Sequence, residues 1–393
     1  MKLAIIGDRG IPAAYSGFST LTEQLATRLV NEYGFEVSVY CRGNYYNERP
    51  KKYQGVNCIY LPAPGGKSLE SIIHSNLSIL HAVFCNYDLA LVLDPGNAPF
   101  VLPLHARGFP VIIHTDGMGW KRQKWSPLQK KYYKWSEWVS ARLSHWLVTD
   151  SKAMQKYYLD EYKTSSSFIP YAGEVGSGQD ESILAEYEIT KDNYYLCVAR
   201  IEPDNNIDLL IREYRLAKSR KPLIVVGAAR YNSQYGRAIA SENDDHVRCI
   251  GGVYDKDKLN ALFANSYVYL HGHEVGGTNP SLLNAMHMSA APVAMDVIFH
   301  REVLTDEGCF FSKKKDHLAS IIKQLDQDHS TVLRLKELAK RQSDTLYRWD
   351  AVVDAYAKLA GIVRESYKDR NLLEKSLAHE VYCPQQFYRE SRK

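Results

Sequence analysis

The chain has 393 residues, of which 45% are apolar and 24% are charged. This size and composition indicate a soluble globular protein of two domains and exclude fibrous, collagenous and disordered chains. The formal net charge of +4 is too small to indicate nucleic acid as a partner by itself. The seven cysteines are scattered without a CxxC pair, so we expect reduced thiols in a cytosolic protein, with no zinc site and no disulfide framework.

Neither a signal peptide nor a membrane-spanning segment is expected. The N-terminus, MKLAIIGDRG, offers only a short apolar run before the first charge. No stretch reaches the roughly 20 apolar residues that span a bilayer. We therefore expect a cytoplasmic protein that touches a membrane, if at all, only at its surface.

Short apolar runs alternate with helical patterns in the first part of the chain. The runs lie at 2–7, 37–41, 57–62, 89–94, 110–115 and 145–150. Helical spacing is clearest over Phe18–Val30 and Leu128–Leu143. Continuous apolar runs are typical of parallel strands that helices cover on both faces. Residues 1–172 are therefore predicted to form a doubly wound α/β domain.

A polar, glycine-rich stretch at 171–191 interrupts this pattern, and a second series follows. Its apolar runs lie at 194–199, 222–227, 247–252, 267–272 and 292–296. They predict a second doubly wound domain at 173–345, with a charged helical stretch at 318–360. Residues 346–393 are expected to pack back on the first domain. Such sheets bind ligands outside the carboxyl ends of their strands, so we expect one ligand per domain in a cleft between them.

The segment HGHEVGGTNPSLLNAM (271–286) is the most informative about chemistry. Gly276 and Gly277 allow the backbone to approach a ligand closely. Asn279 can cap the following helix, with Pro280 in its first turn and Asn284 about one turn further in. A strand, a glycine pair and a capped helix N-terminus together suit an anion such as phosphate. A tight turn whose glycines serve only packing is an equally weighted alternative.

Two other strand ends carry candidate groups. Arg200 follows the run YYLCVA, and its planar guanidinium suits a diphosphate, although most arginines are solvated surface residues. His114 and Asp116 end another run, where they can accept a proton from a reacting hydroxyl or orient it. A hydrogen-bonded core histidine and a turn-forming Asp-Gly pair are the plainer reading of these two residues.

The loop GDRGIPAAYSGFST (7–20) is a further candidate for the cleft, with Gly10, Ser16 and Gly17 as its ligand-facing residues. Its glycines do not follow the GxGxxG spacing of dinucleotide-binding loops, and no acidic ribose partner follows about 20 residues on. A nicotinamide enzyme, including a nucleotide-sugar epimerase or dehydrogenase, is therefore disfavoured.

Residues 120–146 combine aromatic and basic side chains. Five of the six tryptophans lie there, together with seven Lys or Arg residues and a single acid, Glu137. A basic helix with interfacial aromatics is typical of contact with an anionic membrane surface. An ordinary helix that buries its aromatics and solvates its lysines explains the same pattern equally well. Nucleic acid is not expected, because no recognised binding motif accompanies these residues.

The chain resembles a known family through six colinear segments. In order, they are IGDRGIPAAYSGF, HTDGMGWKRQKW, VTDSKAMQKYY, FIPYAGE, ARIEPDNNID and HGHEVGGTNPSLLNAM. Over most of residues 1–305 the chain is similar to the bacterial GT-B glycosyltransferases of the rhamnosyltransferase-like type. The resemblance implies two Rossmann-like domains facing a cleft and C-terminal helices that cross back. It also implies a nucleotide-sugar donor in the C-terminal domain, an acceptor in the N-terminal domain, retention of configuration and no metal or other cofactor.

The resemblance also assigns roles by position. Arg200 would neutralise the donor diphosphate, Gly276, Gly277 and Thr278 would lie under the phosphates, and Asn284 would hold the ribose. His114 and Asp116 would face the acceptor and the transferred sugar. The wider donor-binding set adds Glu274, Asn279 and Ser281. Many relatives act on polyprenyl-diphosphate-linked sugars at the cytoplasmic face of the membrane, which agrees with the basic segment 120–146.

The chain departs from the family pattern at four positions. Ser16 stands where the family usually has Gly, and Ser19, Gly119 and Asn284 stand where it usually has Glu. Asn still bonds a ribose hydroxyl, but more weakly than a carboxylate does, and Glu274 is a candidate substitute.

Two function hypotheses therefore remain. The first is a transferase that moves a sugar, such as rhamnose or another deoxyhexose, from a nucleotide diphosphate to a lipid-linked or surface-glycan acceptor. The second is a weak or inactive relative that binds a glycan or partners an active transferase.

Overall fold

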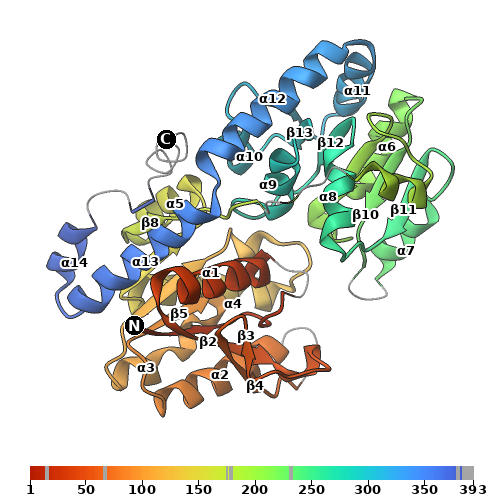
Figure 1. The fold of residues 1–393 in the computed structure, drawn as a ribbon. Helices are drawn as coiled ribbons and strands as arrows, with labels where there is room; N and C mark the ends of the chain where they lie inside the picture. Colours follow the sequence, from red (N-terminus) through yellow and green to blue (C-terminus); the bar gives the residue numbers. More distant parts are fainter. Residues whose placement is uncertain are drawn as a thin grey trace. The chain divides into compact units, whose positions relative to one another are not determined.

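The computed structural model describes residues 1–13, 17–64, 69–173, 176, 180–229, 233–377 and 381–382. The chain divides into two compact units (Figure 1). Unit 1 contains Met1–Trp120, Trp125–Tyr171 and the chain from Trp349 onward, and unit 2 contains Lys121–Lys124 and Ala172–Arg348. Within the described ranges, no helix combines the length and the apolar character needed to cross a bilayer.

Unit 1 is built on an eight-stranded sheet in the order β3-β4-β2-β1-β5-β6-β7-β8. Every neighbouring pair is parallel except β3 and β4, which form a short antiparallel pair. The strands are β1 (Lys2–Ile6), β2 (Glu36–Arg42), β3 (Lys52–Tyr53), β4 (Val56–Leu61), β5 (Leu89–Leu93), β6 (Val111–Thr115), β7 (Trp146–Thr149) and β8 (Ser166–Phe168).

The helices of unit 1 cover both faces of this sheet. They are α1 (Gly17–Tyr33), α2 (Leu69–Val83), α3 (Leu102–Ala106), α4 (Pro127–Leu143), α5 (Lys152–Tyr162), α13 (Trp349–Ser366) and α14 (Arg370–Ser376), with short 3₁₀ turns η1 (Gly43–Tyr45), η2 (Pro95–Phe100) and η3 (Gly119–Lys121). The connection from β1 to β2 runs toward the β3 edge, whereas those that carry α2, α3 and α4 run toward the β8 edge. Because such crossovers are right-handed, α1 lies on one face and α2, α3 and α4 on the other (Figure 1).

The C-terminal helix α13 completes unit 1 by packing against α1. The Arg28 guanidinium lies 5.8 Å from the Trp349 ring centre, and the Tyr33 hydroxyl donates to Asp354 at 3.4 Å. A segment more than 300 residues distant in sequence therefore covers one face of the first sheet.

Unit 2 is built on a six-stranded parallel sheet in the order β11-β10-β9-β12-β13-β14. Its strands are β9 (Tyr195–Val198), β10 (Leu223–Val226), β11 (Val247–Gly251), β12 (Val268–His271), β13 (Pro292–Met295) and β14 (Cys309–Phe311). Its helices are α6 (Ile207–Ala217), α7 (Gln234–Ser241), α8 (Lys256–Ala264), α9 (Pro280–His287), α10 (Ile298–Leu304), α11 (His317–Gln327) and α12 (His329–Leu346), with 3₁₀ turns η4 (Glu181–Tyr187) and η5 (Pro203–Asn205).

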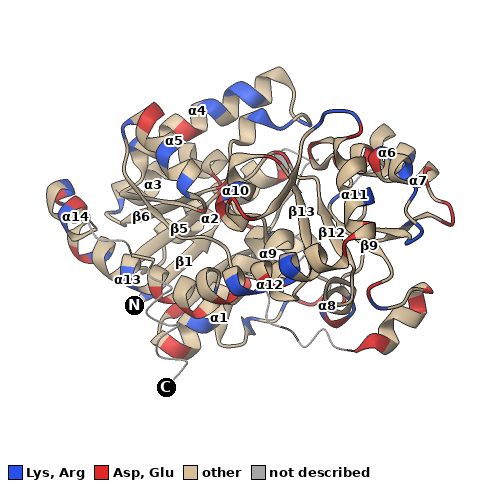
Figure 2. Cartoon of the chain, turned by 90° about the horizontal axis from the view of Figure 1, so that it is seen from above, with Lys and Arg blue, Asp and Glu red and all other residues tan. Residues whose placement is uncertain are grey.

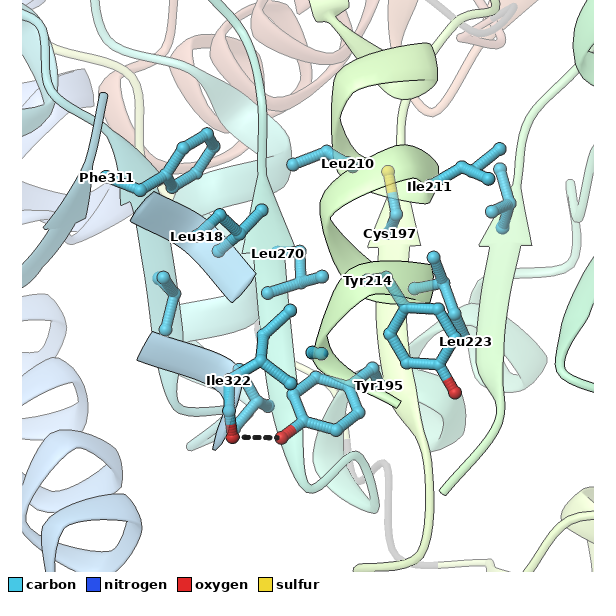
Figure 3. Close-up of a cluster of buried hydrophobic side chains, with 14 of the residues drawn as sticks. Tyr195, Cys197, Leu210, Ile211, Tyr214, Leu223, Leu270, Phe311, Leu318 and Ile322 are labelled. Atoms are coloured by element: carbon cyan, nitrogen blue, oxygen red, sulfur yellow. Dashed lines mark hydrogen bonds between the residues drawn. The ribbon is translucent and has the colours of Figure 1, made fainter. Parts of the chain in front are cut away.

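The core of unit 2 lies where α6 and α11 pack together on one face of the sheet (Figure 3). Leu210, Ile211 and Tyr214 of α6 meet Leu318 and Ile322 of α11. The Tyr195 hydroxyl from β9 is satisfied by the Asp326 carboxylate at 2.9 Å. Burial of these side chains is the main stabilising contribution to the sheet that carries the loops described below.

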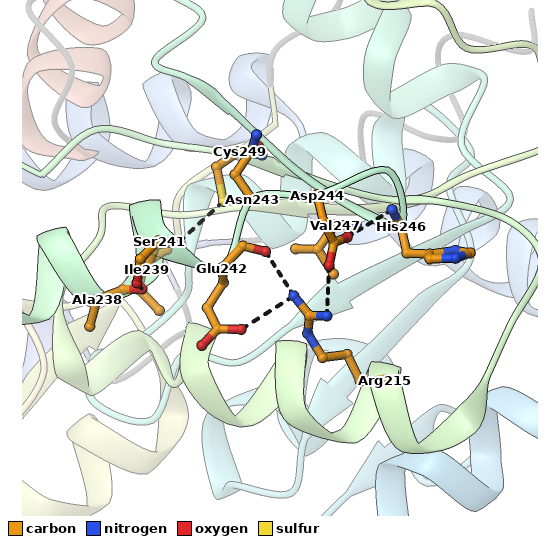
Figure 4. Close-up of polar contacts among 10 residues, drawn as sticks. All are labelled: Arg215, Ala238, Ile239, Ser241, Glu242, Asn243, Asp244, His246, Val247 and Cys249. Atoms are coloured by element: carbon orange, nitrogen blue, oxygen red, sulfur yellow. Dashed lines mark hydrogen bonds and ion pairs between the residues drawn. The ribbon is translucent and has the colours of Figure 1, made fainter.

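A surface network holds the β11 edge of unit 2 (Figure 4). The Arg215 guanidinium on α6 donates to the Glu242 carbonyl at 2.8 Å and to the Asp244 carboxylate at 2.7 Å. Asp244 also accepts the His246 and Val247 backbone N–H groups at 2.8 Å. These backbone bonds, together with Arg215, lower the pKa of Asp244. The network fixes the turn between α7 and β11 and leaves the opposite strand ends open.

The structure confirms the predicted α/β class and every predicted strand to within one residue at each end. It adds β3, β8 and β14, which have two or three residues each and are too short to give a periodic signal. The division between the units falls at Tyr171 and Arg348, beside the expected boundaries at 172 and 345, and the chain from Trp349 belongs to unit 1.

The basic, aromatic segment 120–146 does not lie on one element of the fold. The segment Lys121–Lys124 belongs to unit 2, and Trp146 is a buried residue of β7. The α-helix of this segment, α4, begins at Pro127, where Ser126 and Gln129 form a capping box.

Candidate functional site

The turn between β12 and α9 of unit 2 carries the predicted anion site. Asn279 caps α9 as expected, with its side-chain oxygen accepting the Ser281 N–H at 3.0 Å, and Pro280 begins the helix. Gly276 has a φ of +152°, a backbone conformation that favours glycine. The first turn of α9 therefore presents its N-terminal end at the carboxyl edge of the sheet.

A small, open pocket lies at this turn. Its walls come from the end of β12, the glycine turn and the start of α10, and its lining residues are His273, Glu274, Val275, Gly276, Gly277, Asn279, Val297, Phe299 and His300. All of these residues belong to unit 2. The pocket lies outside the strand ends, where doubly wound sheets bind ligands.

The loop that carries Arg200 is tied to this turn. The Asn206 amide donates to the Gly272 carbonyl at 2.9 Å, and the Glu274 N–H donates to the Asp204 carbonyl at 3.0 Å. The Asn205 amide donates to the Arg200 carbonyl at 2.7 Å. The structure thus brings together two segments that sequence reasoning identified separately, and the asparagines that join them were missed.

The segment Lys121–Lys124 adds three further cations to unit 2, of which Arg122 and Lys124 lie near Arg200. The Gln123 N–H donates to the Asp204 carboxylate at 2.9 Å, and the Lys124 ammonium lies 3.2 Å from Glu202. Burial, followed by the charges of Arg122 and Arg200, lowers the pKa of Lys124 to about 8. Arg122 and Lys124 therefore lie close to Arg200, although the sequence suggested a membrane role for them.

Three histidine rings lie in contact beside the pocket, His273 stacked on His271 and His300 edge-on to it. The ring centres of His271 and His273 are 4.4 Å apart, and those of His271 and His300 are 4.6 Å apart. Burial holds the pKa of each well below its usual value. Nδ1 of His273 is buried without a hydrogen-bond partner among the described residues. These rings are neutral and leave the positive charge of the site to Arg122, Lys124 and Arg200.

The remaining predicted donor residues occupy varied positions. Glu274 forms an ion pair with Lys313 at 2.6 Å, and the Ser281 hydroxyl donates to Asn279 at 2.7 Å. Thr278 is buried, and Asn284 is half-buried in the second turn of α9. Asn279 and Ser281 therefore serve the helix cap, whereas Glu274 is balanced by a lysine.

The carboxyl edge of the unit 1 sheet carries His114 at the end of β6. Its ring is buried, lies edge-on to Phe18 at 5.5 Å, and has its pKa lowered by burial to about 4. Its Nδ1 lies 2.8 Å from the Tyr356 hydroxyl of α13. Burial raises the pKa of Tyr356 well above its usual value, so this hydroxyl keeps its proton.

This pair fixes the hydrogen of His114. If Nδ1 carried the ring hydrogen and donated it, the buried Tyr356 hydroxyl hydrogen would have no partner among the described residues. We therefore assign the hydroxyl as the donor to Nδ1, which places the ring hydrogen on Nε2. Nε2 is buried and lacks a hydrogen-bond partner within the described chain. His114 is thereby arranged as a neutral hydrogen-bond donor rather than as a base.

Carboxylates follow four neighbouring strands of unit 1: Asp8, Asp94, Asp116 and Asp150. Asp8 is buried, and this burial raises its pKa despite bonds from the Ser19 hydroxyl at 3.0 Å and the Gly10 N–H at 3.3 Å. Asp116 accepts the Gly117 N–H at 2.8 Å, which is the turn that an Asp-Gly pair favours.

The predicted N-terminal loop residues have different explanations. Gly10 is buried with a φ of +114°, and a Cβ there would lie 2.5 Å from Sγ of Cys41. Packing against Cys41 therefore explains this glycine without a ligand. Gly17 begins α1, whereas Ser16 lies outside the described residues. Across the described ranges, no group of three or more His, Cys, Asp or Glu residues is placed to hold a metal ion.

Two family models match this chain. Residues 1–174 match a domain of unknown function (DUF1972), and residues 179–342 match glycosyl transferases group 1. The chain is also 22% identical over 284 residues to the O-antigen chain mannosyltransferase C of Escherichia coli, covering 68% of this chain and 74% of that protein.

Solved structures of the same fold include two with high coverage. Sucrose-phosphate synthase from Thermosynechococcus elongatus aligns with a TM-score of 0.75 at 16% identity, over 93% of this chain and 99% of that one. HepE from Anabaena in complex with UDP aligns with a TM-score of 0.71 at 13% identity, over 92% and 100%. These likenesses establish the GT-B fold.

Proposed function

We propose that the chain is a glycosyltransferase in which unit 2 binds a nucleotide diphosphate sugar and unit 1 binds the acceptor. The match of residues 179–342 to glycosyl transferases group 1 and the GT-B fold support this proposal. The proposed sugar is a hexose such as rhamnose or another deoxyhexose. The proposed acceptor is a lipid-linked or cell-surface glycan. Similarity to an O-antigen mannosyltransferase supports the glycan acceptor, and the family resemblance supports the deoxyhexose.

The cluster of cations beside the α9 N-terminus carries this proposal. Arg200, Arg122 and Lys124 lie together at the strand ends, next to the pocket at Gly276. A diphosphate needs charged donors, and guanidinium groups bind it with two parallel hydrogen bonds. The backbone N–H groups of a helix N-terminus add further donors. HepE, of the same fold, has been solved with UDP.

The proposed chemistry uses charge rather than a metal. As the bond between the sugar and the diphosphate breaks, negative charge grows on the leaving phosphate. Fixed cations stabilise that charge more in the transition state than in the ground state. Arg200 and its neighbours would supply this stabilisation without a metal ion, and the sugar would be transferred with retention of configuration.

The proposed acceptor site lies at the carboxyl edge of unit 1. His114 would donate from Nε2 to a sugar oxygen, because its proton is held there by Tyr356. Asp116 and its neighbouring carboxylates suit a ligand rich in hydroxyl groups. A lipid-linked acceptor also places the enzyme at a membrane surface, for which the segment 120–146 is the sequence-based candidate.

A nucleotide-release assay tests this function. Purified protein is supplied with UDP-, dTDP- and GDP-sugars, with and without polyprenyl-diphosphate-linked sugars. We expect release of one nucleotide that depends on an acceptor, and its loss in Arg200→Ala. Arg212→Ala, which removes an exposed arginine from α6, is the matched control and should retain activity. Unchanged release by Arg200→Ala would refute the assigned donor site.

A further inference from the structure

One face of unit 1 gathers exposed apolar side chains. The described chain has fourteen large exposed hydrophobic residues, and seven of them lie on or directly after α2, α3 and α4. They are Leu77, Leu80, Phe84, Leu102, Leu128, Trp135 and Trp138. Phe84 is 89% exposed and Leu128 is 78% exposed, so most of each side chain contacts solvent rather than the core.

The three helices form a continuous surface, which we call the α2–α4 face. All three lie on the same side of the sheet. The turn η2 packs against both α2 and α4, and α2 also packs against α3. The exposed residues of α4 recur every three or four positions, as Leu128, Lys131, Trp135, Trp138 and Arg142, which places them along one stripe of the helix.

The charges on this face have one sign. Only two acids occur on α2, η2, α3 and α4, namely Glu70 and Glu137, and both are buried. Glu70 pairs with Arg42 at 2.7 Å. Glu137 accepts the Tyr157 and Tyr162 hydroxyls at 2.9 and 3.0 Å, and burial raises its pKa to about 7. Neither acid offsets the basic residues outside.

Basic residues fill the gaps between the exposed apolar ones. Lys131 and Arg142 are exposed on α4, and Arg107 directly follows α3. None of these three forms an ion pair with a described residue. Figure 2 marks the basic residues of α4 in blue. Lys134 differs, because it pairs with Glu161 at 2.9 Å.

We propose that the α2–α4 face binds the surface of an anionic lipid bilayer. Exposed Trp, Phe and Leu side chains insert among the headgroups, while Lys131, Arg142 and Arg107 meet lipid phosphates. Charge argues against a second copy of the chain, because two such faces would bring unpaired cations together. The exposed acids on the adjacent helix α5, Asp160 and Glu161, already pair with Lys156 and Lys134. The surface extends beyond the segment 120–146 to α2 and α3, which contain no Lys or Arg.

Vesicle sedimentation tests the electrostatic half of this proposal. Wild-type protein should pellet with vesicles of equal parts phosphatidylcholine and phosphatidylglycerol, but not with phosphatidylcholine alone. Since each basic residue near an anionic surface contributes about 1 kcal/mol, Lys131→Glu with Arg142→Glu should weaken binding at least about tenfold. The matched control, Lys314→Glu with Lys315→Glu in unit 2, should bind as wild type. Equal loss in both double variants would mean that net charge alone drives binding and would overturn the proposal.

Substitutions on α2 test whether the exposed apolar side chains contribute to membrane binding. Leu80→Ser with Phe84→Ser changes α2 alone and should weaken binding at least about tenfold, because two large apolar side chains no longer leave water. Leu216→Ser with Leu333→Ser removes two exposed apolar residues from unit 2 and should have no effect. Thermal unfolding of each variant reports whether the fold is retained.

Three further outcomes would contradict the proposal. They are no binding of the wild type to anionic vesicles, wild-type binding by Leu80→Ser with Phe84→Ser, and a dimer that these α2 substitutions dissociate in the absence of lipid. The assay needs neither donor nor acceptor, so it can fail while nucleotide release succeeds, and the reverse.

Discussion

The two units present opposite chemistry at the carboxyl edges of similar sheets. Unit 2 places Arg200, Arg122 and Lys124 beside a helix N-terminus, whereas unit 1 places four carboxylates and a buried neutral His114. Under the proposed function, the first edge would stabilise a diphosphate and the second would repel it. The proposed assignment of ligands therefore rests on charge rather than on topology, because a doubly wound sheet offers the same kind of crevice in both units.

The largest effect is expected when a charge at the edge of unit 2 is reversed. Arg200→Glu should weaken binding of a nucleoside diphosphate at least roughly hundredfold, because one charged hydrogen bond contributes about 1.5–3 kcal/mol and repulsion is added. Calorimetric titration with UDP, dTDP and GDP measures this change. Asp116→Asn, at the unit 1 edge, should leave nucleotide affinity unchanged. A similar loss in both variants would erase the distinction between the edges.

The next largest effect is expected from a substitution in unit 1, at Tyr356. Tyr356→Phe removes the hydroxyl that holds the proton of His114 on Nε2, so kcat should fall about tenfold. The KM for the donor should not change, since unit 2 is unaltered. Tyr367→Phe, which removes a surface bond to the Gly108 carbonyl, is the control and should retain full kcat. A Tyr356→Phe enzyme with normal kcat would show that this tautomer has no catalytic role.

Acid should destabilise both units. Burial lowers the pKa of His74, His114, His145 and His300 to about 4 each. As pH falls below the ordinary pKa of histidine, these side chains bind protons in the unfolded chain. In the folded chain they bind protons only at about pH 4 and below. The free energy of unfolding therefore decreases over this window, by up to roughly 1.4 kcal/mol per pH unit for each histidine.

Urea unfolding at pH 7 and pH 5 measures this acid effect. Glu137 acts in the opposite direction, because its raised pKa of about 7 contributes stability below pH 4.5 that is lost as pH rises through 7. The histidines outnumber it, so we expect lower stability at pH 5. Equal or greater stability at pH 5 would contradict the buried, neutral state of these rings.

The smallest effect is expected from a substitution at Asn284, at the edge of unit 2. Asn284→Glu restores the residue that the family resemblance leads one to expect, and a carboxylate bonds a ribose hydroxyl more strongly than an amide does. Nucleotide affinity should rise several-fold, roughly as expected for one added charged hydrogen bond. Weaker binding would show that this site is adapted to a neutral group at Asn284.

Local pattern predicted most of the fold but less of the site. Buried parallel strands such as β5 and β12 appear in the sequence as continuous apolar runs. Asn279 and Pro280 indicate the start of α9. These patterns could be recognised because each lies within a few consecutive residues. A buried contact with Cys41 on the neighbouring strand explains Gly10 by packing alone. Trp146, counted with the aromatic residues of the basic segment, lies in the predicted strand and is buried.

The missed residues depend on contacts between distant segments. Tyr356 meets His114 across 242 positions in sequence, and no local period marks that pairing. Gln123 and Lys124 meet Asp204 and Glu202 across about 80 positions. Basic residues in the sequence therefore indicated a charged surface but did not show that Lys124 belongs with Arg200.

Hydrogen exchange with and without a bound nucleoside diphosphate tests the central claim most directly. The account predicts that the nucleotide slows exchange in residues 199–206 and 271–284 of unit 2, while the strand ends of unit 1 at residues 114–117 exchange at an unchanged rate. Protection of the unit 1 strand ends with no protection at the β12–α9 turn would contradict it.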